Sequence, residues 1–260
     1  MNTVTSADGT TIAVERSGSG PPVILVCGGS TDRMSNAGVA EILSERFTAL
    51  NYDRRGRGDS GDTEPYAVGR EIEDIQAVLA DAGGEAFLYG SSSGAALALE
   101  AAARTPGITK LAMWEPPYFT EEFFSGRPPL DTAQTYRKLV SEDRRGDAVE
   151  YFMAKVVGMP AEFVAQARSA PWWASQEKIA HTLAYDAEVM GDYTVPTELA
   201  SSVTAPAIVI DGGASFPFLH ATADALAEAL PNGERATLEG QEHNVDPAAL
   251  AVVLTEFFAG

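Results

Sequence analysis

The feature that most constrains this chain is a serine between two glycines, where a predicted strand turns into a predicted helix. Residues 90–94 read Gly-Ser-Ser-Ser-Gly, a G-x-S-x-G motif centred on Ser92. An apolar run at 86–89 precedes it, and an alanine-rich stretch at 94–104 follows and stops before Pro106. In this context the motif predicts a sharp strand-to-helix turn that projects the Ser92 hydroxyl above a sheet. The flanking glycines remove the Cβ atoms that would clash in such a turn.

Strands and helices alternate over most of the chain. The apolar run at 23–27 lacks polar alternation, which is typical of a strand buried on both faces of a parallel sheet, and further strands are expected at 47–52, 86–89, 108–114 and 207–210. Helices are expected around 72–79, 94–104, 222–230 and from 247, and a short strand at 235–238. Residues 3–16 alternate around an Asp-Gly pair and predict a hairpin. The pattern predicts an α/β fold with a mainly parallel sheet flanked by helices.

One stretch breaks the alternation. Residues 117–204 show helical periodicity and no strand, and they are too long for an ordinary connection. We therefore expect a helical cap at 117–204 on a core domain made of 1–116 and 205–260. The aromatic residues of this stretch either fill its own core or face a substrate. Those predicted to contact substrate are Phe119, Phe123, Trp172 and Trp173.

Composition excludes several kinds of partner. The 260 residues include 18 Lys and Arg against 37 Asp and Glu, a formal net charge of −19 that repels nucleic acid and anionic membranes. A single cysteine, Cys27, excludes an internal disulfide and a cysteine-rich metal site, and we expect neither metal nor cofactor. The chain lacks a secretion signal and an apolar stretch of membrane-spanning length, so we expect a cytoplasmic protein, either monomer or homodimer.

A nucleophilic serine needs a base and an oxyanion hole. The chain has three histidines, and His243 follows the last predicted strand, the position that completes the order nucleophile, acid, histidine. His181 falls in the predicted cap and His220 just after the strand at 207–210. The oxyanion hole is predicted from the amides of Ser93 and Gly29, with Ser30 as an alternative to Gly29. Cys27, with no basic neighbour, is expected to be a packed core thiol.

Together these segments resemble the α/β-hydrolase superfamily over nearly the whole chain. They are Cys-Gly-Gly at 27–29, Tyr-Asp-Arg-Arg-Gly-Arg-Gly-Asp-Ser at 52–60, the G-x-S-x-G motif and His243. The segment at 52–60 is similar to the D-x-R-G-x-G-x-S loop of that superfamily. The family usually has histidine where this chain has Cys27, a difference that leaves the backbone donor in place.

The acid is where the sequence departs from the resemblance. The family commonly places an aspartate a few residues after the penultimate core strand, and here that position is Ser215, which cannot stabilise an imidazolium. Glu115 offers a carboxylate at the end of the strand after the nucleophile. Haloalkane dehalogenases and zearalenone-type lactonases place their acid there. We predict Glu115 as the acid, with Asp211 as the competing candidate.

The resemblance implies a serine hydrolase that cleaves a small, apolar carboxylic ester or lactone through an acyl-enzyme on Ser92. Serine at this position excludes dehalogenase and epoxide-hydrolase chemistry, which needs a carboxylate nucleophile. Thioesters, carbon–carbon bonds and perhydrolysis would use the same triad. The missing aspartate at Ser215 keeps a second class open, a ligand receptor on this fold, and a third is a cofactor-free lyase.

Overall fold

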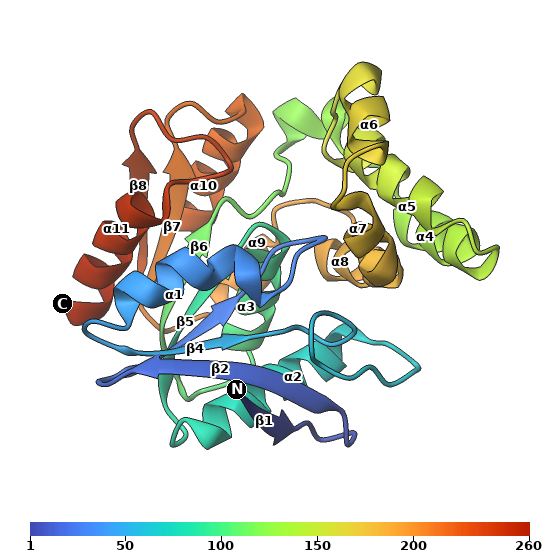
Figure 1. Ribbon diagram of the computed structural model, residues 1–260. Coiled ribbons are helices and arrows are strands. Elements are labelled where there is room, and N and C mark those ends of the chain that lie inside the picture. The colour runs from blue at the N-terminus through green and yellow to red at the C-terminus, as the bar shows by residue number, and fades with distance from the viewer.

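An eight-stranded sheet forms the centre of the molecule in the computed structural model, which describes residues 1–260 (Figure 1). The strands are β1 (Asn2–Thr5), β2 (Thr11–Gly18), β3 (Pro22–Val26), β4 (Thr48–Tyr52), β5 (Ala86–Ser91), β6 (Ile108–Trp114), β7 (Ala207–Gly212) and β8 (Gly233–Leu238). Their order across the sheet is β1-β2-β4-β3-β5-β6-β7-β8. The β1–β2 and β2–β4 pairs are antiparallel and all the others are parallel. The predicted α/β fold class is confirmed.

Successive residues of the central strands are buried on opposite faces of the sheet. In β3, for example, Ile24 and Val26 belong to one core, whereas Val23 and Leu25 belong to the other. This two-sided burial is the reason that these strands read as continuous apolar runs. Helices α1 (Ala37–Leu43) and α11 (Pro247–Ala259) cover one face, and α2 (Val68–Asp81), α3 (Ser93–Ala102) and α10 (Pro217–Ala229) cover the other.

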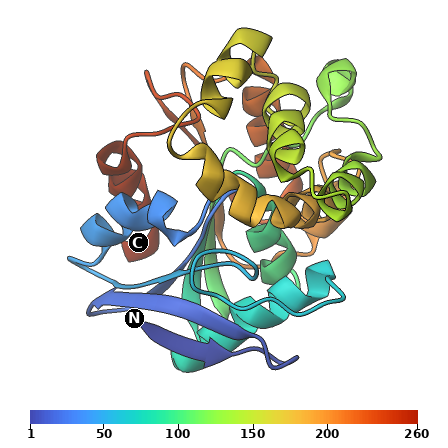
Figure 2. The same cartoon turned by 45° about the vertical axis from the view of Figure 1, so that its right-hand side comes forward.

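Between β6 and β7 the chain forms short helices and a single isolated bridge, Phe119 to Thr194. We call residues 115–206 the insertion. Its helices are α4 (Thr132–Ser141), α5 (Arg145–Tyr151), a π-helix (Phe152–Val156), α6 (Ala161–Arg168), α7 (Trp173–Ile179), α8 (Leu183–Met190) and α9 (Thr197–Ser201), with short 3-10 turns at Glu121–Gly126 and Ala180–Thr182. Helices α4 to α7 lie next to one another, outside the layers formed by the sheet and its flanking helices (Figures 1 and 2). They share a small apolar core that includes Tyr136 and Trp173.

The element boundaries differ from expectation mainly at helix starts. Strand β6 covers the expected 108–114, but α10 begins at Pro217, five residues before the expected 222. Proline is favoured in the first turn of a helix, where its missing N–H would have no intrahelical partner. The short helix α1 and the 3-10 turn before it, Arg33–Asn36, were not expected. No helix combines the length and the apolar composition needed to cross a membrane.

Candidate active site

Ser92 lies at a strained turn between β5 and α3. Its φ and ψ are 54° and −125°, a left-handed conformation that non-glycine residues rarely adopt. Its amide donates to the carbonyl of Trp114 at 2.8 Å, which ties the turn to the end of β6. A Cβ on Gly90 would lie 2.3 Å from the Gly94 carbonyl oxygen, and one on Gly94 would lie 2.4 Å from that of Cys27. Both glycines are therefore required by backbone packing.

The structure brings His243 and Glu115 together. His243 Nδ1 lies 2.6 Å from Glu115 Oε2, and the Gly212 amide donates to Glu115 Oε1 at 2.8 Å. The Glu115 side chain is fully buried directly after β6, whereas that of His243 is 45% exposed. The Trp114 indole N–H donates to the His243 carbonyl at 3.0 Å and holds its loop to the same strand. A buried carboxylate thus accepts from a backbone amide on one oxygen and faces the imidazole with the other.

Asp211, the competing candidate, is occupied elsewhere. It is fully buried in β7, where Thr237 donates to Oδ1 at 2.9 Å and Arg235 to Oδ2 at 3.0 Å. The ring of His220 also contacts Oδ2. Burial alone would raise the pKa of Asp211, but the hydrogen bonds from His220, Arg235 and Thr237 hold it below its usual value. The third histidine, His181, lies 3.4 Å from Asp62.

A cavity of about 650 Å³ joins Ser92 and His243. Its wall is largely apolar and includes residues of both the sheet edge and the insertion. Gly29 and Ser93 also line it, and the Gly29 amide donates no hydrogen bond within the protein. Ser93 is the first residue of α3, where an amide has no partner inside the helix. Ser30 lies outside the lining, and its hydroxyl contacts Gln176. Two amides without a hydrogen-bond partner in the protein thus belong to residues that line the cavity beside Ser92.

Comparison with known proteins identifies the family of the chain. Residues 23–252 match the model of the alpha/beta hydrolase family. The chain belongs to this family. An alpha/beta hydrolase from Sphaerobacter thermophilus DSM 20745 has 53% sequence identity to it, with 99% of this chain and 100% of the other covered and a TM-score of 0.91.

Two more distant proteins are also similar to this hydrolase. The enol-lactonase from Burkholderia xenovorans LB400 shares the fold at 20% identity and a TM-score of 0.72, with all of both chains covered. The uncharacterized hydrolase YraK of Bacillus subtilis (strain 168) is 36% identical over 102 residues. That alignment covers 38% of the hydrolase and 38% of YraK.

The four aromatic residues expected to contact substrate divide into two pairs. Phe119 and Phe123 line the cavity. The structure does not bring Trp172 and Trp173 to it, because Trp173 packs into the core of the insertion and Trp172 is exposed on the surface. Their indole rings lie next to each other, with centroids 6.1 Å apart. We therefore do not include the two tryptophans among the substrate contacts.

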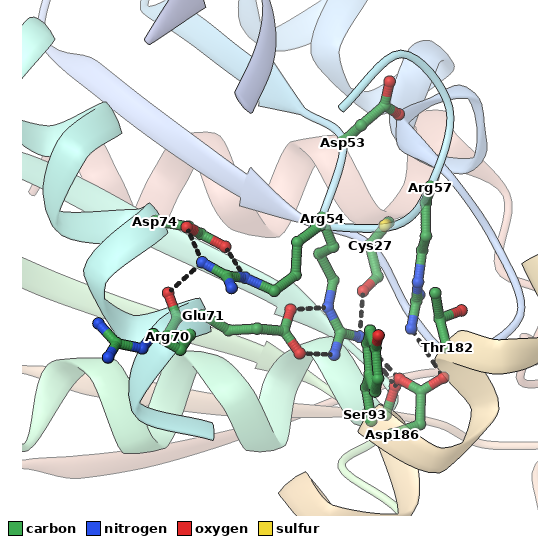
Figure 3. Close-up of polar contacts among 12 residues, drawn as sticks. Cys27, Asp53, Arg54, Arg57, Arg70, Glu71, Asp74, Ser93, Thr182 and Asp186 are labelled. Carbon is green, nitrogen blue, oxygen red and sulfur yellow. Dashed lines mark hydrogen bonds and ion pairs between the residues drawn. The ribbon is translucent and has the colours of Figure 1, made fainter. Parts of the chain in front are cut away.

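Sequence reasoning missed a buried charge network beside the cavity (Figure 3). Asp186 of α8 accepts from Arg54 and from the Ser93 hydroxyl on Oδ1, and from Arg57 on Oδ2, all at 2.8 Å. Arg54 also forms a bidentate pair with Glu71 of α2, with both bonds at 2.7 Å. All five side chains are buried or nearly so. The network joins the insertion to the 52–60 loop and to the residue after Ser92.

The same network fixes the loop that carries Gly29. Arg57 Nη1 donates to the carbonyl of Gly28 at 2.7 Å and to that of Thr31 at 3.2 Å. The Gly28 carbonyl and the Gly29 amide belong to one peptide group, so the guanidinium holds the plane of the peptide whose N–H is free. A hydrogen bond to the carbonyl also polarises the peptide and strengthens its N–H as a donor.

We expect Asp186→Asn to lower the free energy of unfolding at pH 7 by about 3–5 kcal/mol, because it leaves buried Arg57 without a counter-charge and removes one of the two carboxylates paired with Arg54. Burial would raise the pKa of Asp186, but Arg57 and Arg54 hold it below its usual value. A depressed folded pKa stabilises the protein above the unfolded pKa of about 4, and this contribution disappears as pH falls through the folded value.

Urea unfolding of wild type and variant from pH 7 to pH 3 measures this effect. The two unfolding free energies should begin to approach each other below about pH 4 and continue to do so as pH falls toward the lowered pKa of Asp186. Asp143→Asn is the matched control, because Asp143 is exposed, makes no ion pair and has a φ of 58° that asparagine tolerates. If the difference in unfolding free energy between wild type and Asp186→Asn stays constant with pH, Asp186 is not the charged partner of the two arginines.

Proposed function

We propose that this hydrolase cleaves carboxylic esters or lactones through an acyl-enzyme on Ser92. The observation that carries the proposal is the contact of His243 with buried Glu115, at the rim of a cavity that the strained Ser92 also lines. A carboxylate on Nδ1 favours the tautomer with the proton at that atom and leaves Nε2 as a base. Hydroxyl, imidazole and carboxylate then form the three-residue arrangement that activates serine for attack on an acyl carbon.

The proposed steps follow from these positions. His243 removes the Ser92 proton as Oγ attacks the carbonyl carbon, and the amides of Gly29 and Ser93 stabilise the oxyanion. His243 then protonates the leaving alcohol, or the ring oxygen of a lactone. Water activated by the same imidazole releases the acid and restores Ser92. Glu115 orients His243 and stabilises its charged form.

The structure gives no support to the alternative that the protein is a ligand receptor on this fold. It rested on the missing aspartate at Ser215, whereas His243 has a carboxylate partner in Glu115. No observation in the structure favours a lyase. The likeness to the enol-lactonase, at 20% identity, shows the fold alone and does not choose between open-chain esters and lactones.

Active-site labelling tests the proposal. A fluorophosphonate probe should form a covalent adduct, located by peptide mass spectrometry at Ser92. A panel of p-nitrophenyl esters, thioesters and lactones of graded size should show turnover of esters or lactones. Absence of an adduct together with absence of turnover across the panel would overturn the proposal. If thioesters are hydrolysed in preference to esters and lactones, the protein is a thioesterase instead.

A further inference from the structure

Two buried polar side chains that line the cavity have no hydrogen-bond partner. Tyr136 of α4 is 1% exposed, and its hydroxyl makes no hydrogen bond. Asn36, in the 3-10 turn before α1, is 3% exposed, and its Nδ2 makes none either. One belongs to the insertion and the other to the core, so two different parts of the cavity wall each hold a buried hydrogen-bond donor without a partner.

The tyrosine ring is held by packing and not by its hydroxyl. It lies edge to face with Tyr151, with centroids 5.4 Å apart and an interplanar angle of 84°, inside the apolar core of the insertion. A phenylalanine would fill this place without burying an unbonded hydroxyl, which costs stability. Burial, and after it the neighbouring Tyr193 and Asp186, raises the pKa of Tyr136, so the hydroxyl keeps its proton and can donate.

We propose that Tyr136 and Asn36 form a polar subsite that donates hydrogen bonds to uncharged oxygen atoms in the acyl part of the substrate. This inference rests on the proposed function, because it concerns the occupant of the same cavity. The substrate class is an ester or lactone whose acyl part is mainly apolar and carries a keto, ether or hydroxyl oxygen in addition to the scissile carbonyl. A plain alkanoyl group would leave both donors unpaired on binding.

The charges around the cavity favour a neutral oxygen over an anionic one. Asp186 is already paired with Arg54 and Arg57, and His243 with Glu115. Lys155 is the remaining charged residue of the lining, and it is exposed at the rim. Because the chain carries a formal charge of −19, it repels an anionic substrate at long range. Uncharged donors in a weakly polar cavity suit an uncharged acceptor.

Matched substrates test the subsite. The probes are p-nitrophenyl octanoate and its oxo derivatives, with the ketone placed at each internal carbon in turn. For wild type we expect kcat/KM of at least one oxo isomer to exceed that of octanoate about tenfold, the effect of one hydrogen bond. Tyr136→Phe should bring the ratio of kcat/KM for the preferred oxo isomer to kcat/KM for octanoate close to one, while Tm stays equal or rises. Asn36→Leu tests the second donor in the same way, and Tyr151→Phe is the control that removes a neighbouring hydroxyl outside the cavity lining.

Binding separates the subsite from catalysis. The octanoyl and oxo-octanoyl amides are titrated calorimetrically into Ser92→Ala, with and without Tyr136→Phe. A tenfold tighter Kd for an oxo amide that disappears with Tyr136→Phe supports the subsite even if wild type hydrolyses no ester, in which case only the proposed function fails. Equal affinities for all amides and equal kcat/KM for all esters would show that water alone occupies the subsite and overturn the inference. An equal fall for oxo and plain probes on Tyr136→Phe would assign the tyrosine to packing and overturn it as well.

Discussion

Replacing Ser92 by alanine is expected to lower kcat about a millionfold, to a residual rate supplied by binding and the oxyanion hole. Alanine removes one oxygen and keeps the Cβ, so the packing around the turn is preserved. The KM for esters should change little, since the rest of the cavity is unaltered. Steady-state kinetics with the best p-nitrophenyl ester of the panel measures both parameters.

Ser91→Ala is the matched control for this variant. It removes the neighbouring hydroxyl in the same pentapeptide and should lose far less activity than Ser92→Ala. Fluorophosphonate should still label Ser91→Ala and should no longer label Ser92→Ala. Substantial ester turnover by a folded Ser92→Ala protein would show that another group attacks the substrate.

Glu115→Gln is expected to lower kcat about ten-thousandfold, the loss seen when a triad carboxylate becomes an amide. The amide has the shape of the carboxylate, so it can still accept from the Gly212 amide. It cannot balance the charge of the imidazolium, and its NH₂ group can force His243 into the wrong tautomer. Circular dichroism checks that the variant is folded. The value of kcat is measured at saturating concentrations of the ester.

Asp211→Asn separates the two candidate acids. It weakens the contacts with Arg235 and Thr237, so Tm should fall, while kcat should stay within about tenfold of wild type because no contact joins Asp211 to His243. The reverse pattern, an inactive Asp211→Asn and a near-normal Glu115→Gln, would make Asp211 the acid. Ser92 and His243 would keep their proposed roles in that case.

The parts of the fold that sequence predicted are those where local pattern and burial coincide. The strand at 108–114 is one, because every residue from Leu111 to Trp114 is buried and all of them are apolar. The strand-to-helix turn at Ser92 is another, because its glycines are required by backbone atoms in contact with them. Glu115 could be considered from sequence because it directly follows a recognisable strand.

The charge network could not be predicted in the same way. Asp186 lies 132 residues after Arg54 in the chain, within a helix whose sequence shows nothing unusual. Its pairing depends on how α8 packs against the core, which periodicity does not determine. The two tryptophans show the opposite difficulty. Aromatic residues in an insertion fill its interior or its surface as readily as a substrate cavity, and the sequence cannot tell these places apart.

The pairing of Asp186 with both arginines has a consequence for how a substrate reaches Ser92. Swinging α8 away from the core would separate one buried carboxylate from two guanidinium groups in a weakly polar medium, a costly motion. Exposed residues of the cavity wall are found elsewhere, among them Lys155 and Val157 of the insertion and Phe216 and Asn244 of the core. We therefore expect substrate and product to pass these exposed residues, while α8 stays paired with Arg54 and Arg57.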